Sequence, residues 1–151
     1  MADWEAFAEG FRFDIWANRL WLECIERKGL GEPDRALLGH ILSAQKVWVK
    51  RVQGESMGQM PVVDLTEEAM ADIHRQWIEV LQTAGDDRVI DYHRTTGEAL
   101  SSKLSDIAAH VINHGTYHRG ELRGLCRVRS DEDFPETDRL RYVFATQGTR
   151  L

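Results

Sequence analysis

The sequence lacks most features that mark membrane and secreted proteins. No apolar run approaches the roughly 20 residues of a membrane-spanning helix, and the acidic start MADWEAFAEGFRFD lacks the charged-then-apolar pattern of a signal peptide. The two cysteines, Cys24 and Cys126, are too few for a disulfide scaffold and sit among apolar neighbours. We therefore expect a cytoplasmic protein with two buried, reduced thiols.

An excess of basic residues is also absent. The net charge is −6 at pH 7, and the arginines between residues 119 and 129 are diluted by Glu121 and by the acidic stretch DEDFPE. We expect a solvated helix face there and no nucleic-acid partner. The chain of 151 residues is 42% hydrophobic, with three prolines and no repeat, which indicates a single domain over residues 1–151.

Four segments carry apolar residues at helical spacing. The first spans about residues 3–28 and ends at GLGEP, and the second begins at Pro33 or Asp34 and stops near Gly54. The linker GESMGQMPVVD precedes a third helix, which opens at Thr66 with a capping acid. The fourth begins near residue 101 or 102, or a few residues later, and continues to about residue 128.

These segments predict an all-α fold, a four-helix bundle of antiparallel type, because each long amphipathic helix must bury its apolar strip against the others. DDRVIDYHRTTGEAL has no helical period, and its alternation allows a short strand or hairpin before the fourth helix. The tail RLRYVFATQ predicts a short terminal helix.

Three of the six histidines lie four residues apart in HVINHGTYHRGEL: His110, His114 and His118. Residues at this spacing differ by about 40° around a helix and about 6 Å along it, so two of them can hold one metal ion. His110 and His118, about 12 Å apart, cannot share that ion. The apolar direction of the helix favours His114 and His118 as ligands and places His110 at the rim. Gly115 stands where the HEXXH metalloproteases carry glutamate, which excludes that pattern.

A third ligand must come from another helix. His40 shares a sector of its helix with Leu37 and Ala44 and can point inward, whereas His74 lies at the border of an apolar strip and His93 lies in the irregular segment. We predict His40 as the third ligand. The spacing alone leaves open the alternative that these histidines are packed and hydrogen-bonded without a metal.

Several neighbours have predicted roles around this site. Candidates to hold an imidazole from outside are Asp14, Asn18 and Glu121, for which surface or capping roles are the simpler reading. Tyr117 and Arg119 point about 100° away from the ligand strip, which favours structural roles. We expect Trp16 and Trp48 in the core, with a cavity wall as the lesser alternative.

HVINHGTYHRGEL resembles the closing-helix signature of the DinB/YfiT-like superfamily of metal-dependent four-helix bundles, and FDIWANRLWLECI, LLGHILSAQKVWVKRV and PETDRLRYVF resemble its other segments in the same order. The resemblance implies up-down-down-up connections with a long crossover between helices two and three, and a homodimer. It also implies one divalent metal ion held by His40, His114 and His118. Three imidazoles leave a coordination position open, and nickel, zinc and iron all accept such ligands.

Related bundles include thiol-dependent transferases and isomerases that use bacillithiol, mycothiol or glutathione. The leading hypothesis is therefore an enzyme whose metal ion activates a low-molecular-weight thiol, for S-transfer, or a water, for hydrolysis. The alternatives are a non-catalytic metal- or ligand-binding module of a stress response, and a purely structural role. The sequence identifies neither the small-molecule substrate nor a catalytic residue.

Overall fold

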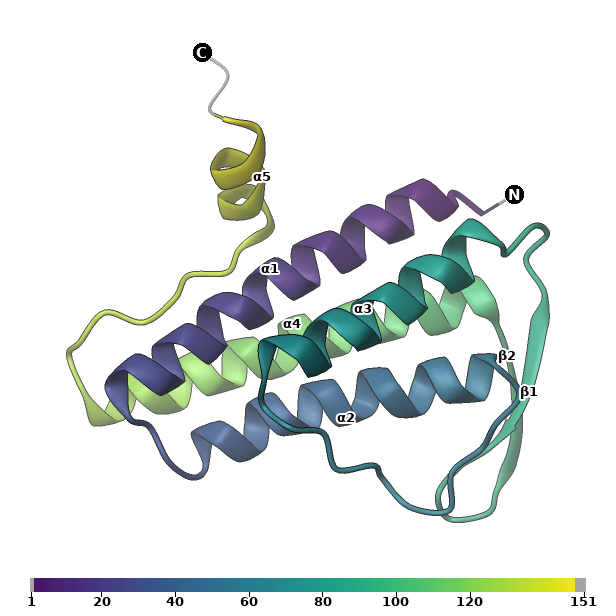
Figure 1. Ribbon diagram of the computed structural model, residues 1–151, viewed down its shortest axis with the longest axis horizontal. Helices are drawn as coiled ribbons and strands as arrows, with labels where there is room; N and C mark the ends of the chain where they lie inside the picture. The colour runs from purple at the N-terminus through teal and green to yellow at the C-terminus, as the bar shows by residue number, and fades with distance from the viewer. Residues whose placement is uncertain (1, 149–151) are drawn as a thin grey trace.

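The computed structural model describes residues 2–148, and this part of the chain forms five helices and one antiparallel hairpin (Figure 1). The elements in chain order are α1 (Trp4–Lys28), α2 (Asp34–Val52), α3 (Glu67–Gln82), β1 (Val89–His93), β2 (Ala99–Lys103), α4 (Leu104–Arg129) and α5 (Arg139–Gln147). The predicted all-α four-helix bundle, with a hairpin before the fourth long helix and a short terminal helix, is confirmed.

The long helices have the predicted up-down-down-up connections. Figure 1 shows α1 and α4 running in one direction and α2 and α3 in the other, with residues 53–66 as the long crossover between them. α1 packs mainly on α3, and α2 packs mainly on α4. Helices α2 and α4 are therefore antiparallel neighbours, and residues late in α2 face residues early in α4.

Local capping explains several helix ends. The Asp3 carboxylate accepts a hydrogen bond from the Ala6 N–H at 3.0 Å, and the Thr66 hydroxyl accepts one from the Ala69 N–H at 3.1 Å. At the other end of α1, Gly29 has φ 62°, the left-handed conformation that glycine adopts without a Cβ clash. The predicted extents of α1 and the predicted start of α3 are confirmed.

The start of α4 lies at the later end of the expected range, past residues 101 and 102. Ser101 and Ser102 belong to strand β2, and α4 begins at Leu104. The cause is a residue distant in sequence: the Asp87 carboxylate accepts hydrogen bonds from the N–H of Ser105 at 3.0 Å and from its hydroxyl at 2.5 Å. This long-range cap satisfies an orphan donor of the first turn, so the preceding serines remain in the strand.

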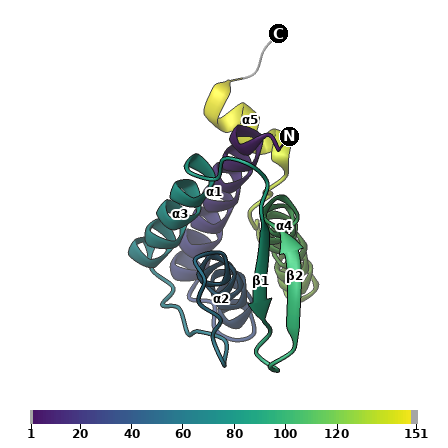
Figure 2. The same cartoon turned by 90° about the vertical axis from the view of Figure 1, so that its right-hand side faces the viewer.

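The hairpin lies across one end of the bundle, beside α2 and α4, while α5 stands outside the bundle near α1 (Figure 2). Strand β1 alternates exposed and buried residues, and its buried Ile90 and Tyr92 join the core.

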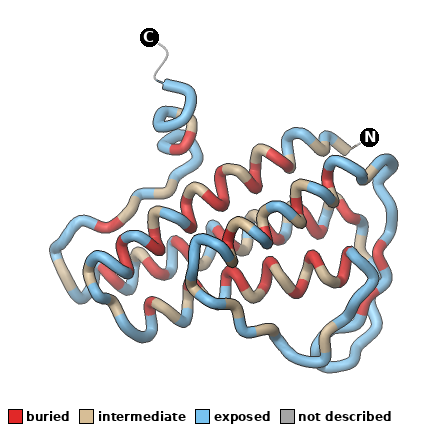
Figure 3. The backbone as a smooth tube through the Cα atoms, viewed as in Figure 1, coloured by how far each residue is buried: buried red, intermediate tan, exposed pale blue. Residues whose placement is uncertain are grey.

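Buried residues line the facing sides of the four long helices, and exposed residues dominate the hairpin and α5 (Figure 3). Trp77 is fully buried and stacks on Phe11 with ring centroids 4.7 Å apart. Cys24 and Cys126 are buried free thiols, as expected. None of the helices within residues 2–148 combines the length and the apolar character needed to cross a membrane.

Candidate metal centre

The structure brings His40, His114 and His118 together. One ligand nitrogen from each imidazole lies within 4.8 Å of the others, and the Nε2 atoms of His40 and His114 are 3.2 Å apart. Two nitrogens that bind one tetrahedral metal ion with bonds of 2.0–2.1 Å are separated by about 3.3 Å. The His40–His114 pair already has this spacing, so the three side chains fit a mononuclear site.

The helices explain why these three imidazoles meet. His114 and His118 lie on successive turns of α4, with ring centroids 4.4 Å apart. His40 comes from the antiparallel neighbour α2, and its ring centroid lies 4.9 Å from that of His114 and 4.6 Å from that of His118. His40 is exposed and the other two are partly buried, so the site opens to solvent on one side.

The other histidines lie outside this group. His110 is exposed, one turn before His114 along α4, with ring centroids 5.8 Å apart. His74 is partly buried on α3, and His93 is an exposed residue of β1 whose backbone N–H donates to the Ser56 hydroxyl. Within residues 2–148, the group with metal-binding geometry contains only the three predicted ligands.

Glu121 holds one of the imidazoles from outside the site. Its Oε1 lies 2.8 Å from Nδ1 of His118, so the carboxylate accepts a hydrogen bond from Nδ1–H and leaves Nε2 as the free lone-pair atom. A carboxylate behind a metal-binding imidazole fixes the ring orientation and raises its basicity. The prediction for Glu121 therefore agrees with the geometry.

The electrostatics of the site favour uncharged imidazoles at His40 and His114. Burial lowers the pKa of His114 to about 4, with further lowering by the neighbouring His118, His40 and His110. Burial and His118 also lower the pKa of His40, partly opposed by Glu121. At pH 7 these rings are neutral, which is the form that binds a metal ion.

A buried polar network adjoins the two ligands of α4. Arg119, next to His118 in sequence, donates through Nη1 to Asp14 Oδ1 at 2.6 Å and to Asn18 Oδ1 at 2.7 Å. Asp14 Oδ2 accepts from Asn18 Nδ2 at 3.2 Å and from Gln45 Nε2. All four side chains are nearly inaccessible to solvent. Asp14 and Asn18 are thus neither surface nor capping residues, and in this network they bind Arg119.

This network ties together the helices that carry the ligands. Gln45 belongs to α2, Arg119 to α4, and Asp14 of α1 bonds both of them. The approach of α1 requires a glycine in α4, because a Cβ at Gly115 would lie 2.4 Å from Asp14 Oδ1. The structural role predicted for Arg119 is confirmed, whereas the roles of Gln45 and Gly115 were not predicted. The glycine between the two histidines is the sequence signal that could have revealed this contact.

A cavity of about 340 Å³ lies next to the histidine cluster. It is lined by Trp48, Tyr92, Ser102, Asp106, Ile107 and His110. Trp48 therefore packs against the core on one side and forms a cavity wall on the other, the role that was the lesser alternative from the sequence. Trp16 is partly buried between Phe13 and Tyr142, and Tyr117 is 72% exposed beside His118.

Comparison with known proteins supports the reading of this site. The sequence profile of the DinB family matches residues 16–142, a range that includes all three histidines. The chain belongs to the DinB family. It is also similar to Protein DinB of Bacillus subtilis (strain 168), with 21% identity over 125 residues that cover 74% of this chain and 72% of the relative. Family membership and the clustered histidines of this DinB chain agree with each other.

Proposed function

We propose that this DinB-family chain is a metal-dependent enzyme in which His40, His114 and His118 hold one divalent ion and leave a coordination position open for a small molecule. The observation that carries the proposal is the close approach of three ligand nitrogens, all within 4.8 Å. Nickel, zinc and ferrous iron are the candidate ions, because all three accept imidazole ligands.

The surroundings of the site support an open rather than a closed metal centre. No fourth histidine, cysteine or carboxylate within residues 2–148 joins the three ligands. Glu121 is engaged with Nδ1 of His118, and His110 lines the adjoining cavity one turn away from His114. A site with three protein ligands beside a cavity suits a catalytic metal better than a structural one.

The reaction class that we propose is thiol-dependent S-transfer, with metal-assisted hydrolysis as its variant. When bound, the metal ion supplies acidity, which makes a coordinated thiol or water a nucleophile at neutral pH. The chain's own residues position the ion. Glu121 fixes the His118 ring, and the partly buried imidazoles of His114 and His118 limit the access of water to one side. A bound low-molecular-weight thiol makes a protein cysteine unnecessary, and both cysteines are buried.

Elemental analysis tests the proposal first. The protein is purified untagged, without chelator or added metal, beside a His114→Ala, His118→Ala double variant. We expect about one divalent ion per wild-type chain and none in the variant, followed by thiol-transfer assays with the ion found. The absence of an ion in the wild type, together with no uptake of added zinc or nickel, would exclude the metal site. A retained ion without thiol- or water-dependent turnover would indicate a binding module instead.

We also propose that the chain forms a homodimer through α5. Leu140 and Phe144 lie four residues apart on this helix, are 63% and 48% exposed, and therefore share one apolar side. The helix stands outside the bundle, where a partner can reach it (Figure 1). Sedimentation equilibrium of the wild type and of a Leu140→Glu, Phe144→Glu variant should give a dimer and a monomer, respectively. A monomeric wild type contradicts the proposal.

A further inference from the structure

The hairpin, α2 and the start of α4 border a cavity of about 340 Å³, at the end of the bundle that faces the viewer in Figure 2. None of the three clustered histidines belongs to its wall. The volume lies in the range of small-molecule sites. The chemistry of a ligand in this cavity therefore follows from the six side chains that form the wall: Trp48, Tyr92, Ser102, Asp106, Ile107 and His110.

Three of these side chains carry rings. The rings of Trp48 and Tyr92 meet edge to face with centroids 5.0 Å apart, and the His110 ring lies 5.4 Å from that of Trp48. Ile107 adds an apolar side chain, and the hydroxyl of Ser102 lies 3.0 Å from that of Tyr92. The wall thus offers an apolar surface against which a flat ring can pack.

Asp106 is the one residue of the wall with a formal charge at pH 7 when histidine is counted as neutral. Its carboxylate forms no hydrogen bond or ion pair with another side chain within residues 2–148, whereas the carboxylate of Asp87 binds Ser105. Its place in the first turn of α4 suits the helix dipole and leaves its oxygens free to accept hydrogen bonds. The side chain is exposed, so a ligand can reach it from solvent. These free acceptors favour a ligand that donates hydrogen bonds and carries a positive charge.

The guanidinium of Arg51 determines which way round such a ligand lies. Its central carbon is 4.4 Å from the centroid of the Trp48 ring and 5.4 Å from that of Tyr92, so both rings already bind a cation. Arg51 does not belong to the wall, but its positive charge opposes a second cation at these rings. The charged group of the ligand is therefore expected beside Asp106, and its apolar body beside Trp48 and Tyr92.

We propose that this cavity binds a small molecule with a flat apolar body and a positively charged amine or amidine group, which donates hydrogen bonds to Asp106. The apolar body packs against Trp48 and Tyr92. The inference goes beyond the proposed function, because it requires neither a metal ion nor any of the three histidine ligands.

Three probes of nearly the same shape test the charge requirement: benzamidine is positively charged at pH 7, benzamide is neutral and benzoate is negatively charged. Each is titrated by NMR into the ¹⁵N-labelled full-length protein, both as purified and after treatment with chelator. We expect the amide signals of Asp106 and His110 and the indole signal of Trp48 to shift. Benzamidine should bind about five-fold more tightly than benzamide, the effect of one ion pair at an accessible carboxylate, and benzoate should bind most weakly. The preference should be the same before and after chelation, which separates it from the outcome of the metal analysis.

Variants of two aspartates locate the effect. Asp106→Asn should remove the preference for benzamidine, and Asp106→Glu should retain part of it. Asp91→Asn is the matched control, because it removes one negative charge next to Tyr92. Asp91 lies on the opposite face of β1 from Tyr92 and accepts a hydrogen bond from the Ser101 hydroxyl, so this variant should keep the preference. Circular dichroism confirms that each variant is folded.

Four results would overturn the proposal. They are no binding of benzamidine to the wild type, a preference for benzamidine over benzamide of less than two-fold, binding of benzoate as tight as that of benzamidine, and an unchanged preference in a folded Asp106→Asn. If Asp106→Asn does not fold, the comparison of the three probes in the wild type and in Asp106→Glu decides.

Discussion

Replacement of Asp14 by asparagine tests whether the buried network stabilises the bundle beside the metal site. The change keeps the shape of the side chain, so it creates no cavity. It removes the negative charge that faces Arg119, and the two side chains are 3% and 1% exposed. Leaving one partner of a buried ion pair uncompensated costs about 3–5 kcal/mol. The new amide N–H₂ group also replaces an oxygen that accepts from Asn18 and Gln45, so two donors would face another donor.

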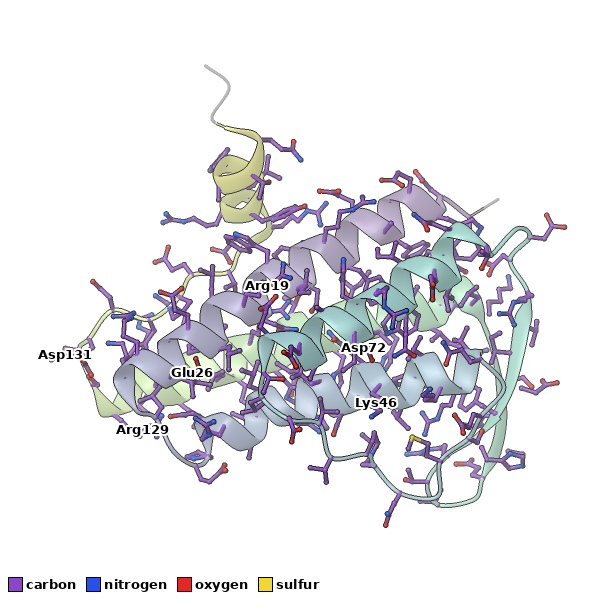
Figure 4. The ribbon with its side chains drawn as sticks, in the orientation of Figure 1. Arg19, Glu26, Lys46, Asp72, Arg129 and Asp131 are labelled. Atoms are coloured by element: carbon purple, nitrogen blue, oxygen red, sulfur yellow. The ribbon has the colours of Figure 1, made fainter. Side chains whose placement is uncertain are left out.

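Asp34→Asn is the matched control. Asp34, at the start of α2, is equally buried and binds Arg129, an arginine of α4 like Arg119. Nη2 of Arg129 lies 2.6 and 2.7 Å from the two oxygens of Asp34. Arg129 is 45% exposed and lies at the end of the bundle opposite the hairpin (Figure 4). Because water can solvate this guanidinium, we expect Asp34→Asn to cost only about 1–3 kcal/mol.

Urea unfolding of the chelator-treated proteins measures both costs. Zinc titration of the folded variants then measures the effect on the metal site apart from the effect on stability. The affinity for zinc should fall more for Asp14→Asn than for Asp34→Asn, because the network of Asp14 ties together the two helices that carry the ligands. The reasoning fails if Asp14→Asn loses less than about 1 kcal/mol, well below the cost of an uncompensated buried charge. Equal zinc affinity in the two variants would show that the network does not position the ligands.

Three further results are expected. Gly115→Ala should destabilise the fold by about 1–3 kcal/mol through overpacking, whereas Gly120→Ala, with no atom within 4 Å of its Cβ, should be neutral or stabilising in the same thermal unfolding assay. Glu121→Gln should lower zinc affinity about ten-fold, measured by competition with a chelator, because it weakens the bond to His118. The pKa of His114, lowered from 6.5 to about 4, should make the metal-free protein lose stability as pH falls from 6.5 to 4, since only the unfolded chain takes up the proton there. Urea midpoints across this range should drop less in His114→Gln.

The helices follow from local sequence signals, while the choice among the possible starts of α4 does not. Caps such as Asp3 and Thr66 act on residues three positions away, so the sequence shows them directly. The cap on Ser105 comes from Asp87, 18 residues earlier, across the hairpin. No local pattern reveals such a contact, because it exists only after β1 and β2 have paired.

The candidate site also has a part that could be predicted from the sequence and a part that could not. Helical spacing limits the pair to His110 with His114 or His114 with His118, and the apolar direction of the helix selects the second pair. Its distance to His40 follows once α2 packs on α4. The cavity wall formed by Trp48 depends on the hairpin folding over that residue, where Tyr92 meets its ring edge to face at 5.0 Å. A tryptophan on an apolar helix face gives the same sequence pattern whether it ends in the core or lines a cavity, so its second role could not be read from spacing.

The short segment from His114 to Arg119 contacts both α2 and α1. His114 and His118 face α2, while the residues that follow each of them, Gly115 and Arg119, are rotated by about 100° and face Asp14 on α1. The metal ligands and the α4 side of the buried polar network are therefore parts of one short segment of helix. A side chain at Gly115 that pushes α4 away from α1 must also shift both imidazoles relative to the ligand on α2. Loss of metal affinity in Gly115→Ala would come from this displacement.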